Sequence, residues 1–438
     1  MAAHRVSRRT FLKTGAALTG AAVPLILAAG VRAATKPNER ITVGMIGVGR
    51  QGVLINLKQF LASEQARVVA VADVDAWRAA NAKSIIDKHY GDTGAGCAAF
   101  HDFREMLARP DIDAIMVSTP DHWHCAAGIA AAKAGKHVSV EKPLSTCVAH
   151  GRQLCEAVRK QGVVSRTDSE FRSLPAMWQA VQAVRNGRIG TLQHINVGAP
   201  ADSRPIGNPP ETPVPEGLDY DFWLGPAAPA PYTEKRVHPR ETVSARPGWL
   251  RISDYTNGMV SNWGSHLNDI AQWANDSDRS GPVSVEGTGS FSEGLWDTIV
   301  DFQLHYAYAN GVTLDYSMGK EPGVEFQGSD GWVKAFYPAK IEASDPAILD
   351  EARGASETVD LSATLTDKED FLTAIREGRE TLEPVEVGHR TVSLCQIGLI
   401  AIQTGRKLQW DPEKERFAGD EAANALLDRP VRGDWFKV

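Results

Sequence analysis

The chain has 438 residues, of which 43% are hydrophobic and 23% are charged. This length predicts two domains, and this composition is typical of a soluble globular protein rather than a disordered or fibrous one. The formal net charge is −7, which does not favour nucleic acid or anionic lipid as a partner.

Residues 1–34 differ in composition from the rest of the chain. A basic start that includes Arg8 and Arg9 precedes the apolar run GAALTGAAVPLILAAGV, and small residues follow. This pattern predicts a twin-arginine export signal, and with it a periplasmic or extracytoplasmic location, rather than a membrane span. A basic tail before a short membrane anchor is the alternative. Removal of the segment's five positive charges would change the net charge from −7 to −12.

A glycine-rich turn follows the first predicted strand. The strand at 41–46 leads into GVGRQG at 47–52, and a helix is predicted from residue 53. A strand, a GxGxxG turn and a helix in this order are typical of a dinucleotide site, where glycines let the backbone approach a pyrophosphate. The residues expected to contact this cofactor are Gly47, Gly49, Arg50, Gln51 and Gly52.

An acidic residue ends the second predicted strand. The strand at 66–72 leads into Asp73, which lies 21 residues beyond Gly52. A carboxylate there accepts hydrogen bonds from ribose hydroxyls and repels a 2′-phosphate, so we predict NAD(H) in preference to NADP(H). Arg78 would weaken this preference, and a helix-capping role is the alternative for Asp73.

Alternation of strands and helices continues along the chain. Strands are predicted at 112–118 and 137–140, and an alanine-rich helix between them ends at Lys133. Repeated units of this kind predict a parallel sheet that binds ligands at the carboxyl ends of its strands. At that rim we expect Thr119, Pro120, His124, Glu141 and Lys142.

The second half has a different pattern. Alternating strands are predicted at 192–198, 283–291, 298–306, 311–318 and 323–336, with hairpin turns at Asn310-Gly311 and Asp330-Gly331. The proline- and glycine-rich segment 200–247 is predicted to be a long functional or interfacial loop.

Several motifs together resemble the Gfo/Idh/MocA oxidoreductase family. They are GxGxxG at 47–52, the acid at 73, TPxxxH at 119–124 and EKP at 141–143. The pieces WLGP at 223–226, WGSH at 263–266 and GRKLQWD at 405–411 resemble an exported bacterial subgroup. The resemblance implies an α/β chain with an N-terminal Rossmann domain, which we place at 39–165. It also implies a C-terminal α+β domain, at 166–438, with a large, mostly antiparallel open sheet.

The resemblance also implies the reacting groups. Lys142 would bind the substrate oxygen and stabilise the developing alkoxide. His266 matches the histidine of the family segment DxxxH and is the expected base. Asn262 stands where the family has an aspartate, and an amide can orient a hydroxyl but cannot accept a proton as a base.

Other side chains are candidates for orienting the substrate. Asp269 would share a helix face with His266, and would either orient its imidazole or simply pair with that ring structurally. The residues expected in the wall of a sugar pocket are Arg172, Trp178, Tyr255 and Trp263, with core packing as the alternative for each tryptophan. Weaker candidates are His122 and His238, and the segment 220–223 would either close the pocket or pack the loop.

Together these features predict hydride transfer between a nicotinamide and a secondary hydroxyl of a sugar, polyol or glycoside. Free NAD is scarce outside the cytoplasm, so the cofactor is expected to travel with the folded enzyme and to be recycled on it. Two alternatives remain open. One is a glycosidase that works by transient oxidation and elimination. The other is a non-catalytic, cofactor-retaining sugar-binding protein, which the Asn262 substitution would favour.

Cysteine usage and sheet size support three further predictions. The five cysteines, at 97, 125, 147, 155 and 395, lack the spacing of a zinc site, so we predict no metal. Buried thiols are expected rather than a disulfide framework. A large sheet with helices on one face would leave a second apolar face to bury, so we predict a homodimer or homotetramer.

Overall fold

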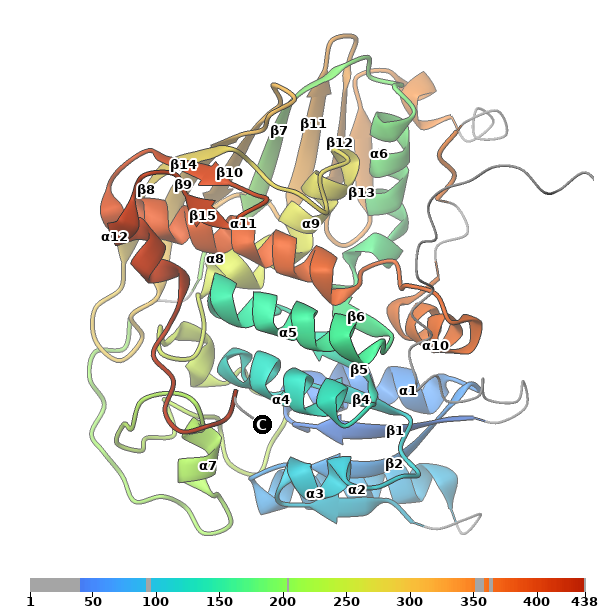
Figure 1. Cartoon of the computed structure of the whole chain (residues 1–438), viewed down its shortest axis with the longest axis vertical. Helices are drawn as coiled ribbons and strands as arrows, with labels where there is room; N and C mark the ends of the chain where they lie inside the picture. Colours follow the sequence, from blue (N-terminus) through green and yellow to red (C-terminus); the bar gives the residue numbers. More distant parts are fainter. Residues whose placement is uncertain (1–39, 92–95, 203–204, 351–357, 362–364, 437–438) are drawn as a thin grey trace, which may run out of the picture. The chain divides into compact units, whose positions relative to one another are not determined.

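The computed structural model describes residues 40–91, 96–202, 205–350, 358–361 and 365–436. The predicted export signal at 1–34 lies outside these residues. The described part of the chain contains a six-stranded sheet and a nine-stranded sheet (Figure 1).

The first sheet is parallel throughout and has the strand order β3-β2-β1-β4-β5-β6. Its strands are β1 (Ile41–Ile46), β2 (Ala66–Ala72), β3 (Ala98–Phe100), β4 (Ala114–Val117), β5 (His137–Glu141) and β6 (Ser165–Asp168). The connecting helices are η1 (Gly52–Leu57), α1 (Lys58–Ala62), α2 (Ala76–Tyr90), α3 (Phe103–Leu107), α4 (Asp121–Lys133) and α5 (Val148–Gln161). This confirms the predicted Rossmann-like sheet, whose order reverses between β1 and β4. The predicted domain boundary at 165 falls on the first residue of β6.

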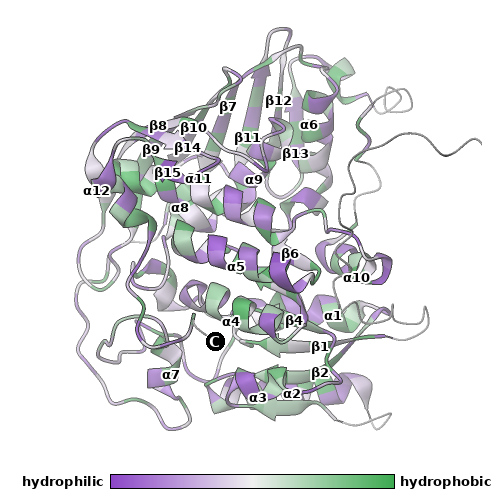
Figure 2. Cartoon of the chain, viewed as in Figure 1, coloured by the Kyte–Doolittle hydropathy of each residue, from purple (hydrophilic) through white to green (hydrophobic). Residues whose placement is uncertain are grey.

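Both faces of this sheet are buried at its centre, where β1 and β4 are predominantly apolar strands. In β4, Ala114 and Met116 join one core cluster, whereas Ile115 and Val117 join the cluster on the other face. This is the two-residue period of a strand. Figure 2 shows hydrophilic and hydrophobic stripes along α5, as expected of a helix with one buried face.

The second sheet has the order β13-β12-β11-β7-β10-β9-β8-β14-β15. Its strands are β7 (Leu192–Ala199), β8 (Ser284–Phe291), β9 (Ile299–Ala307), β10 (Thr313–Met318), β11 (Gly323–Gly328), β12 (Trp332–Phe336), β13 (Lys340–Ala343), β14 (Leu408–Asp411) and β15 (Arg416–Phe417). Only the β7–β10 pair is parallel in the described residues, so the prediction of a mostly antiparallel sheet is confirmed. The predicted strand at 323–336 is two strands, because the turn at Asp330-Gly331 divides it.

Helices cover one face of the second sheet and bury a large apolar core (Figure 1). They are α6 (Pro175–Arg185), α9 (Gly264–Ala274) and α11 (Val385–Thr404). The remaining helical segments are η2 (Phe171–Ser173), α7 (Tyr220–Leu224), η3 (Gly248–Arg251), α8 (Met259–Asn262), η4 (Pro346–Leu349), α10 (Asp367–Glu377), α12 (Glu421–Asn424) and η6 (Ala425–Leu427).

The other face of the second sheet is polar, so the prediction of an apolar second face is wrong. Outward side chains of neighbouring strands make polar contacts, including a hydrogen bond between His305 and Asp315 at 2.6 Å and an ion pair between Lys334 and Glu325 at 3.0 Å. Strand β9 alternates buried apolar residues with polar ones such as Gln303, which faces outward. The argument for a dimer or tetramer from a buried apolar face therefore fails. The oligomeric state stays a prediction, which light scattering would test.

All five cysteines are buried free thiols, as predicted. Among the helices of the described residues, none combines the length and the apolar character that a membrane span requires.

Candidate active site

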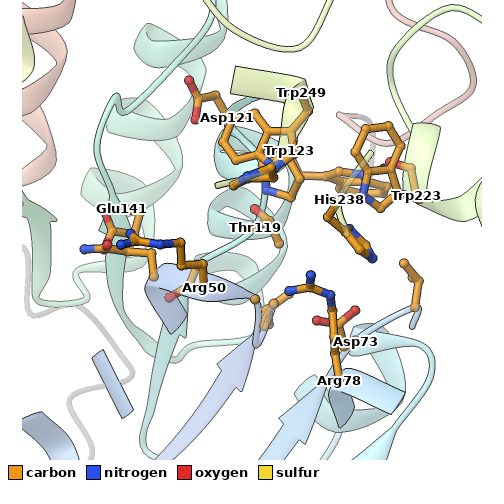
Figure 3. A pocket seen from close by; sticks show the side chains of 18 of the residues that line it. Arg50, Asp73, Arg78, Thr119, Asp121, Trp123, Glu141, Trp223, His238 and Trp249 are labelled. Carbon is orange, nitrogen blue, oxygen red and sulfur yellow. Dashed lines mark hydrogen bonds between the residues drawn. The ribbon is translucent and has the colours of Figure 1, made fainter. Parts of the chain in front are cut away.

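A cavity lies at the carboxyl ends of the strands of the first sheet (Figure 3). The predicted cofactor residues that line it are Gly47, Gly49, Arg50, Gln51, Asp73, Thr119, Pro120, His124, Glu141 and Lys142. Residues 245–247, 249–250 and Asn262, which follow the first domain in sequence, line it as well. Figure 3 shows Arg50 and Glu141 at one end of the cavity and Asp73, Arg78 and His238 at the other.

The glycine turn has a backbone conformation and a close packing that only glycine allows at position 47. Gly47 has φ +81°, and a Cβ atom there would lie 2.8 Å from the Ser118 backbone. Gly52 does not line the cavity. A Cβ atom on it would lie 2.6 Å from the carbonyl oxygen of Gly47, so this glycine allows the helix to start against the turn. The open turn before a helix fits the pyrophosphate of a dinucleotide.

Asp73 lines the cavity after β2 and also holds the glycine turn. Its Oδ2 accepts a hydrogen bond from the Val48 N–H at 2.9 Å, and its Oδ1 accepts one from the Asp75 N–H at 3.0 Å. Burial raises the pKa of Asp73, and the nearby Arg78 opposes this shift. Each carboxylate oxygen can accept a second hydrogen bond, so Asp73 can still bind a ribose hydroxyl.

The EKP segment places its glutamate and its lysine in different surroundings. Glu141 is buried and accepts a hydrogen bond from the Asn56 amide at 2.8 Å, and burial raises its pKa. Lys142 points across the cavity, with its Nζ 3.5 Å from the backbone oxygen of Asn262. The Lys142–Pro143 peptide is cis. Glu141 is therefore a supporting residue, whereas the Lys142 ammonium is available to a ligand.

His124 and Asp121 join the elements that surround Lys142. The two ring nitrogens of His124 lie 2.7 Å from the Pro143 carbonyl oxygen and 2.9 Å from that of Thr119. Asp121 is buried at the start of α4 and accepts a hydrogen bond from the Thr256 hydroxyl at 2.7 Å. Burial raises its pKa to about 6. Asp121 thus ties the first domain to the segment that ends in Asn262.

His266 is buried and lies close enough to Lys142 for their charges to interact, although it does not line the cavity itself. Its ring stacks on Phe171, with centroids 4.2 Å apart, and its Nδ1 contacts the Ser169 carbonyl oxygen. Burial lowers the pKa of His266 well below its usual value, and the charge of Lys142 lowers it further. A neutral ring that donates from Nδ1 keeps a lone pair on Nε2, as a base requires.

Asp269 and Arg172 do not have substrate-orienting positions. The Arg172 guanidinium donates to both oxygens of Asp269, at 2.8 and 2.7 Å, and both side chains are at most 1% exposed. Asp269 therefore pairs with Arg172, which matches neither predicted role, since both roles placed this carboxylate against the His266 ring. The prediction that Arg172 forms part of a pocket wall is wrong, because its guanidinium is occupied within the core.

The aromatic candidates divide between the cavity and the core. Trp223 lines the cavity with Trp123 and Trp249, which sequence reasoning missed. Tyr255 is fully buried and packs on Trp223 instead, so it does not form a wall. Trp178 packs partly buried against the core of the second sheet, and His122 is buried against Tyr255. His238 lines the cavity at its Asp73 end.

Trp263 is half-buried near His266 but does not line the cavity. Its ring centroid lies 6.2 Å from that of His266 and 5.7 Å from that of Tyr337. Tyr337 is 46% exposed and stacks on Phe171 at 5.1 Å. No sequence signal singled out Tyr337, because it follows β12, far from the family motifs.

The carboxyl group of Glu170, which lies close enough to Glu141 for their charges to interact, makes stability depend on pH. Burial, followed by the charges of Asp367 and Glu141, raises the pKa of Glu170 to about 8. The unfolded chain loses this proton near pH 4.5, so the folded state loses relative stability as pH rises from about 4.5 towards 8. We expect Glu170→Gln to reduce the fall in urea midpoint between pH 5 and pH 8. An equal fall in both proteins would contradict this.

One group of possible metal ligands lies outside the cavity. Atoms of Cys147, His150 and Asp428 lie within 4.8 Å of one another, and Asp428 is exposed. The positive charge of Arg429 acts on the Cys147 thiol and opposes the rise that burial causes in its pKa. Within the described residues, none of these three side chains lines the cavity that holds Lys142.

Two family models match the chain. The model described as "Oxidoreductase family, NAD-binding Rossmann fold" matches residues 41–168, and "Oxidoreductase family, C-terminal alpha/beta domain" matches residues 207–437. Both models carry the designation GFO_IDH_MocA. The second match alone covers more than half of the chain.

Three individual proteins illustrate the similarity. A glycosyl hydrolase family 109 protein of Saccharopolyspora erythraea is 36% identical over 159 residues, which are 32% of this chain and 34% of that protein. Curated relatives align over 23% to 55% of their own lengths. The WlbA dehydrogenase of Bordetella pertussis, in complex with NADH and UDP-GlcNAcA, has a TM-score of 0.63 at 17% identity, over 85% of this chain and 99% of that one. A levoglucosan dehydrogenase, in complex with NADH and levoglucosan, has a TM-score of 0.60 at 17% identity with the same coverage.

Proposed function

The chain belongs to the Gfo/Idh/MocA oxidoreductase family, and on that premise we propose that it is a sugar oxidoreductase. It would transfer hydride between NAD(H) and a secondary hydroxyl of a sugar, polyol or glycoside. The observation that carries this proposal is that Lys142 lines the same cavity as the glycine turn and Asp73. Relatives in structures with NADH and a sugar ligand support the same class of substrate.

Two side chains would handle the substrate proton. NAD bound along the glycine turn would supply a hydride acceptor at its nicotinamide. The Lys142 ammonium would hydrogen-bond the reacting oxygen and stabilise its negative charge. His266 would accept the hydroxyl proton on Nε2, since burial keeps its imidazole neutral at working pH. The half-buried Asn262 would orient the hydroxyl and not deprotonate it.

We further propose that NAD(H) is preferred over NADP(H) and stays bound throughout the cycle. Asp73 supports the preference because its carboxylate would repel a 2′-phosphate. Retention would suit a protein exported in the folded state, as the twin-arginine pattern of residues 1–34 predicts, because the cofactor would be loaded before export. The hydride would then pass to a second substrate on the same protein.

The first test is chemical analysis of the protein purified from the exported fraction without added nucleotide. Mass analysis of an acid extract is expected to find NAD or NADH near one per chain. Addition of sugars, polyols and glycosides should then change the absorbance at 340 nm for a subset of them. Saturable sugar binding without any redox change would favour the sugar-binding alternative, and failure to bind NAD(H) would contradict the proposal.

A second candidate function is NAD-dependent glycoside cleavage. The observation that favours it is the relative named as a glycosyl hydrolase of family 109. In that reaction the sugar would be oxidised transiently, lose its aglycone and be reduced again, so no net redox change would accompany bond cleavage. Release of nitrophenol from nitrophenyl glycosides, without consumption of external NAD, would distinguish this activity from the first.

A further inference from the structure

A segment of the second domain covers the cofactor cavity. This covering segment, residues 238–250, contacts the first domain along the cavity. His238 Nε2 lies 2.9 Å from Asp75 Oδ2, and the Arg78 guanidinium donates to the Thr242 carbonyl oxygen at 3.2 Å. Arg50 Nε, in the glycine turn, donates to the Ser244 carbonyl oxygen at 3.3 Å. The covering segment is therefore hydrogen-bonded to the first domain at two places, one beside Asp73 and the other at the glycine turn.

Arg246 belongs to this segment and lines the cavity. It lies two residues beyond Ser244, and the charges that act on it are those of Arg251, Asp202 and Arg50. Among the described residues, Arg246 has no hydrogen-bond partner and no ion-pair partner. The Arg246 side chain is still exposed to solvent at the cavity rim, although partial burial, followed by the charge of Arg251, lowers its pKa.

The remaining nearby charges do not neutralise Arg246 and Arg50. Asp202 accepts hydrogen bonds from Arg251 at 3.2 and 3.0 Å, so its charge is shared with a third arginine. Glu141, at the Arg50 end of the cavity, accepts a hydrogen bond from the Asn56 amide at 2.8 Å and forms no ion pair with Arg50 among the described residues. Two guanidinium groups without a carboxylate of their own form a site for an anion that carries more than one negative charge.

We infer that Arg246 and Arg50 clamp the pyrophosphate of a dinucleotide from opposite sides. The pyrophosphate would lie on the glycine turn, which carries Arg50, and Arg246 would reach it from the covering segment. This inference rests on the proposed function, because it assumes that NAD(H) binds in this cavity. It assigns cofactor retention to the second domain, whose covering segment must move before the nucleotide leaves.

Two variants of the full chain test the clamp. Arg246→Ala removes the side chain from the cavity, and Arg240→Ala removes an exposed arginine of the same segment that does not line it. Protein loaded with NADH is mixed with excess NAD⁺, and the loss of NADH fluorescence gives the release rate. Arg246→Ala is expected to release NADH at least about tenfold faster, because a charge-assisted contact is lost. Arg240→Ala should match the wild type.

Titration with two fragments locates the contact. ADP-ribose carries the pyrophosphate and adenosine does not, so Arg246→Ala should weaken binding of ADP-ribose about tenfold and leave adenosine unchanged. Equal losses for both fragments would overturn the clamp and indicate a general effect of the loop. Unchanged NADH release with weaker binding of a sugar acid would overturn it as well, and would assign Arg246 to an anionic substrate. In both cases a wild type that still binds NADH leaves the proposed function standing. A wild type that binds neither NADH nor ADP-ribose would overturn both proposals.

Discussion

Replacement of Lys142 by methionine is expected to lower kcat by about 10²- to 10⁴-fold with the best sugar substrate, the range for loss of an oxyanion donor or an acid–base group. Methionine keeps most of the aliphatic length and removes the ammonium. In the proposed mechanism, the negative charge that develops on the substrate oxygen would then lose the positive partner that stabilises it. Binding of NADH should change by less than about threefold, because the glycine turn and Asp73 remain intact.

The control for this prediction is Lys83→Met. Lys83 is 41% exposed on α2, where it pairs with Asp87 at 2.5 Å, so its replacement should leave kcat unchanged. Steady-state kinetics and NADH fluorescence titration measure the two effects separately. If Lys142→Met bound NADH normally and kept more than about a tenth of wild-type kcat, which is less than the loss expected for an acid–base group, Lys142 would not be the reacting cation.

The Lys142→Met variant also tests the role of Asn262, whose backbone oxygen lies 3.5 Å from the Lys142 ammonium. Because an amide at this position cannot act as a base, the proposed mechanism requires His266 for proton removal. Burial, followed by the charge of Lys142, keeps the imidazole of His266 neutral. Removal of the Lys142 charge would raise the pKa of His266. The pH profile of the remaining activity should therefore shift its lower limb towards higher pH.

Local motifs explain why much of the site could be predicted from the sequence. The glycine turn, Asp73, Thr119 and the EKP segment each follow a strand of apolar residues, and parallel strands bring their carboxyl ends to one edge. The period-two pattern of β9 and β10 likewise identified strands, because buried and polar residues alternate there. Short-range patterns of this kind need no knowledge of tertiary contacts.

Residues paired over long sequence distances could not be predicted in this way. Arg172 and Asp269 are 97 residues apart, so no local pattern distinguished an ion pair from a pocket wall. Trp249 reaches the cavity only because the covering segment lies against the first domain. The polar face of the second sheet was missed because a predicted sheet size says nothing about which side chains point outward.

Replacement of Arg172 by methionine is expected to lower the free energy of unfolding by about 3–5 kcal/mol. The substitution keeps much of the packing volume but leaves the Asp269 carboxylate buried without its bidentate partner. The Thr391 hydroxyl, 3.4 Å from Asp269 Oδ1, cannot replace a charge. Urea denaturation followed by circular dichroism measures the change.

A second ion pair provides the comparison for Arg172. Arg279 pairs with Glu380 at 2.7 Å, but both side chains are more than half exposed, so Arg279→Met should cost no more than about 1 kcal/mol. Removal of both buried charges, in Arg172→Met/Asp269→Leu, should recover part of the lost stability, because an unpaired charge no longer remains in the core. The opposite result would be an Arg172→Met variant that kept its full stability but required more sugar to reach half-maximal rate. That result would contradict the structural role and support the predicted position of Arg172 in the wall of the substrate pocket.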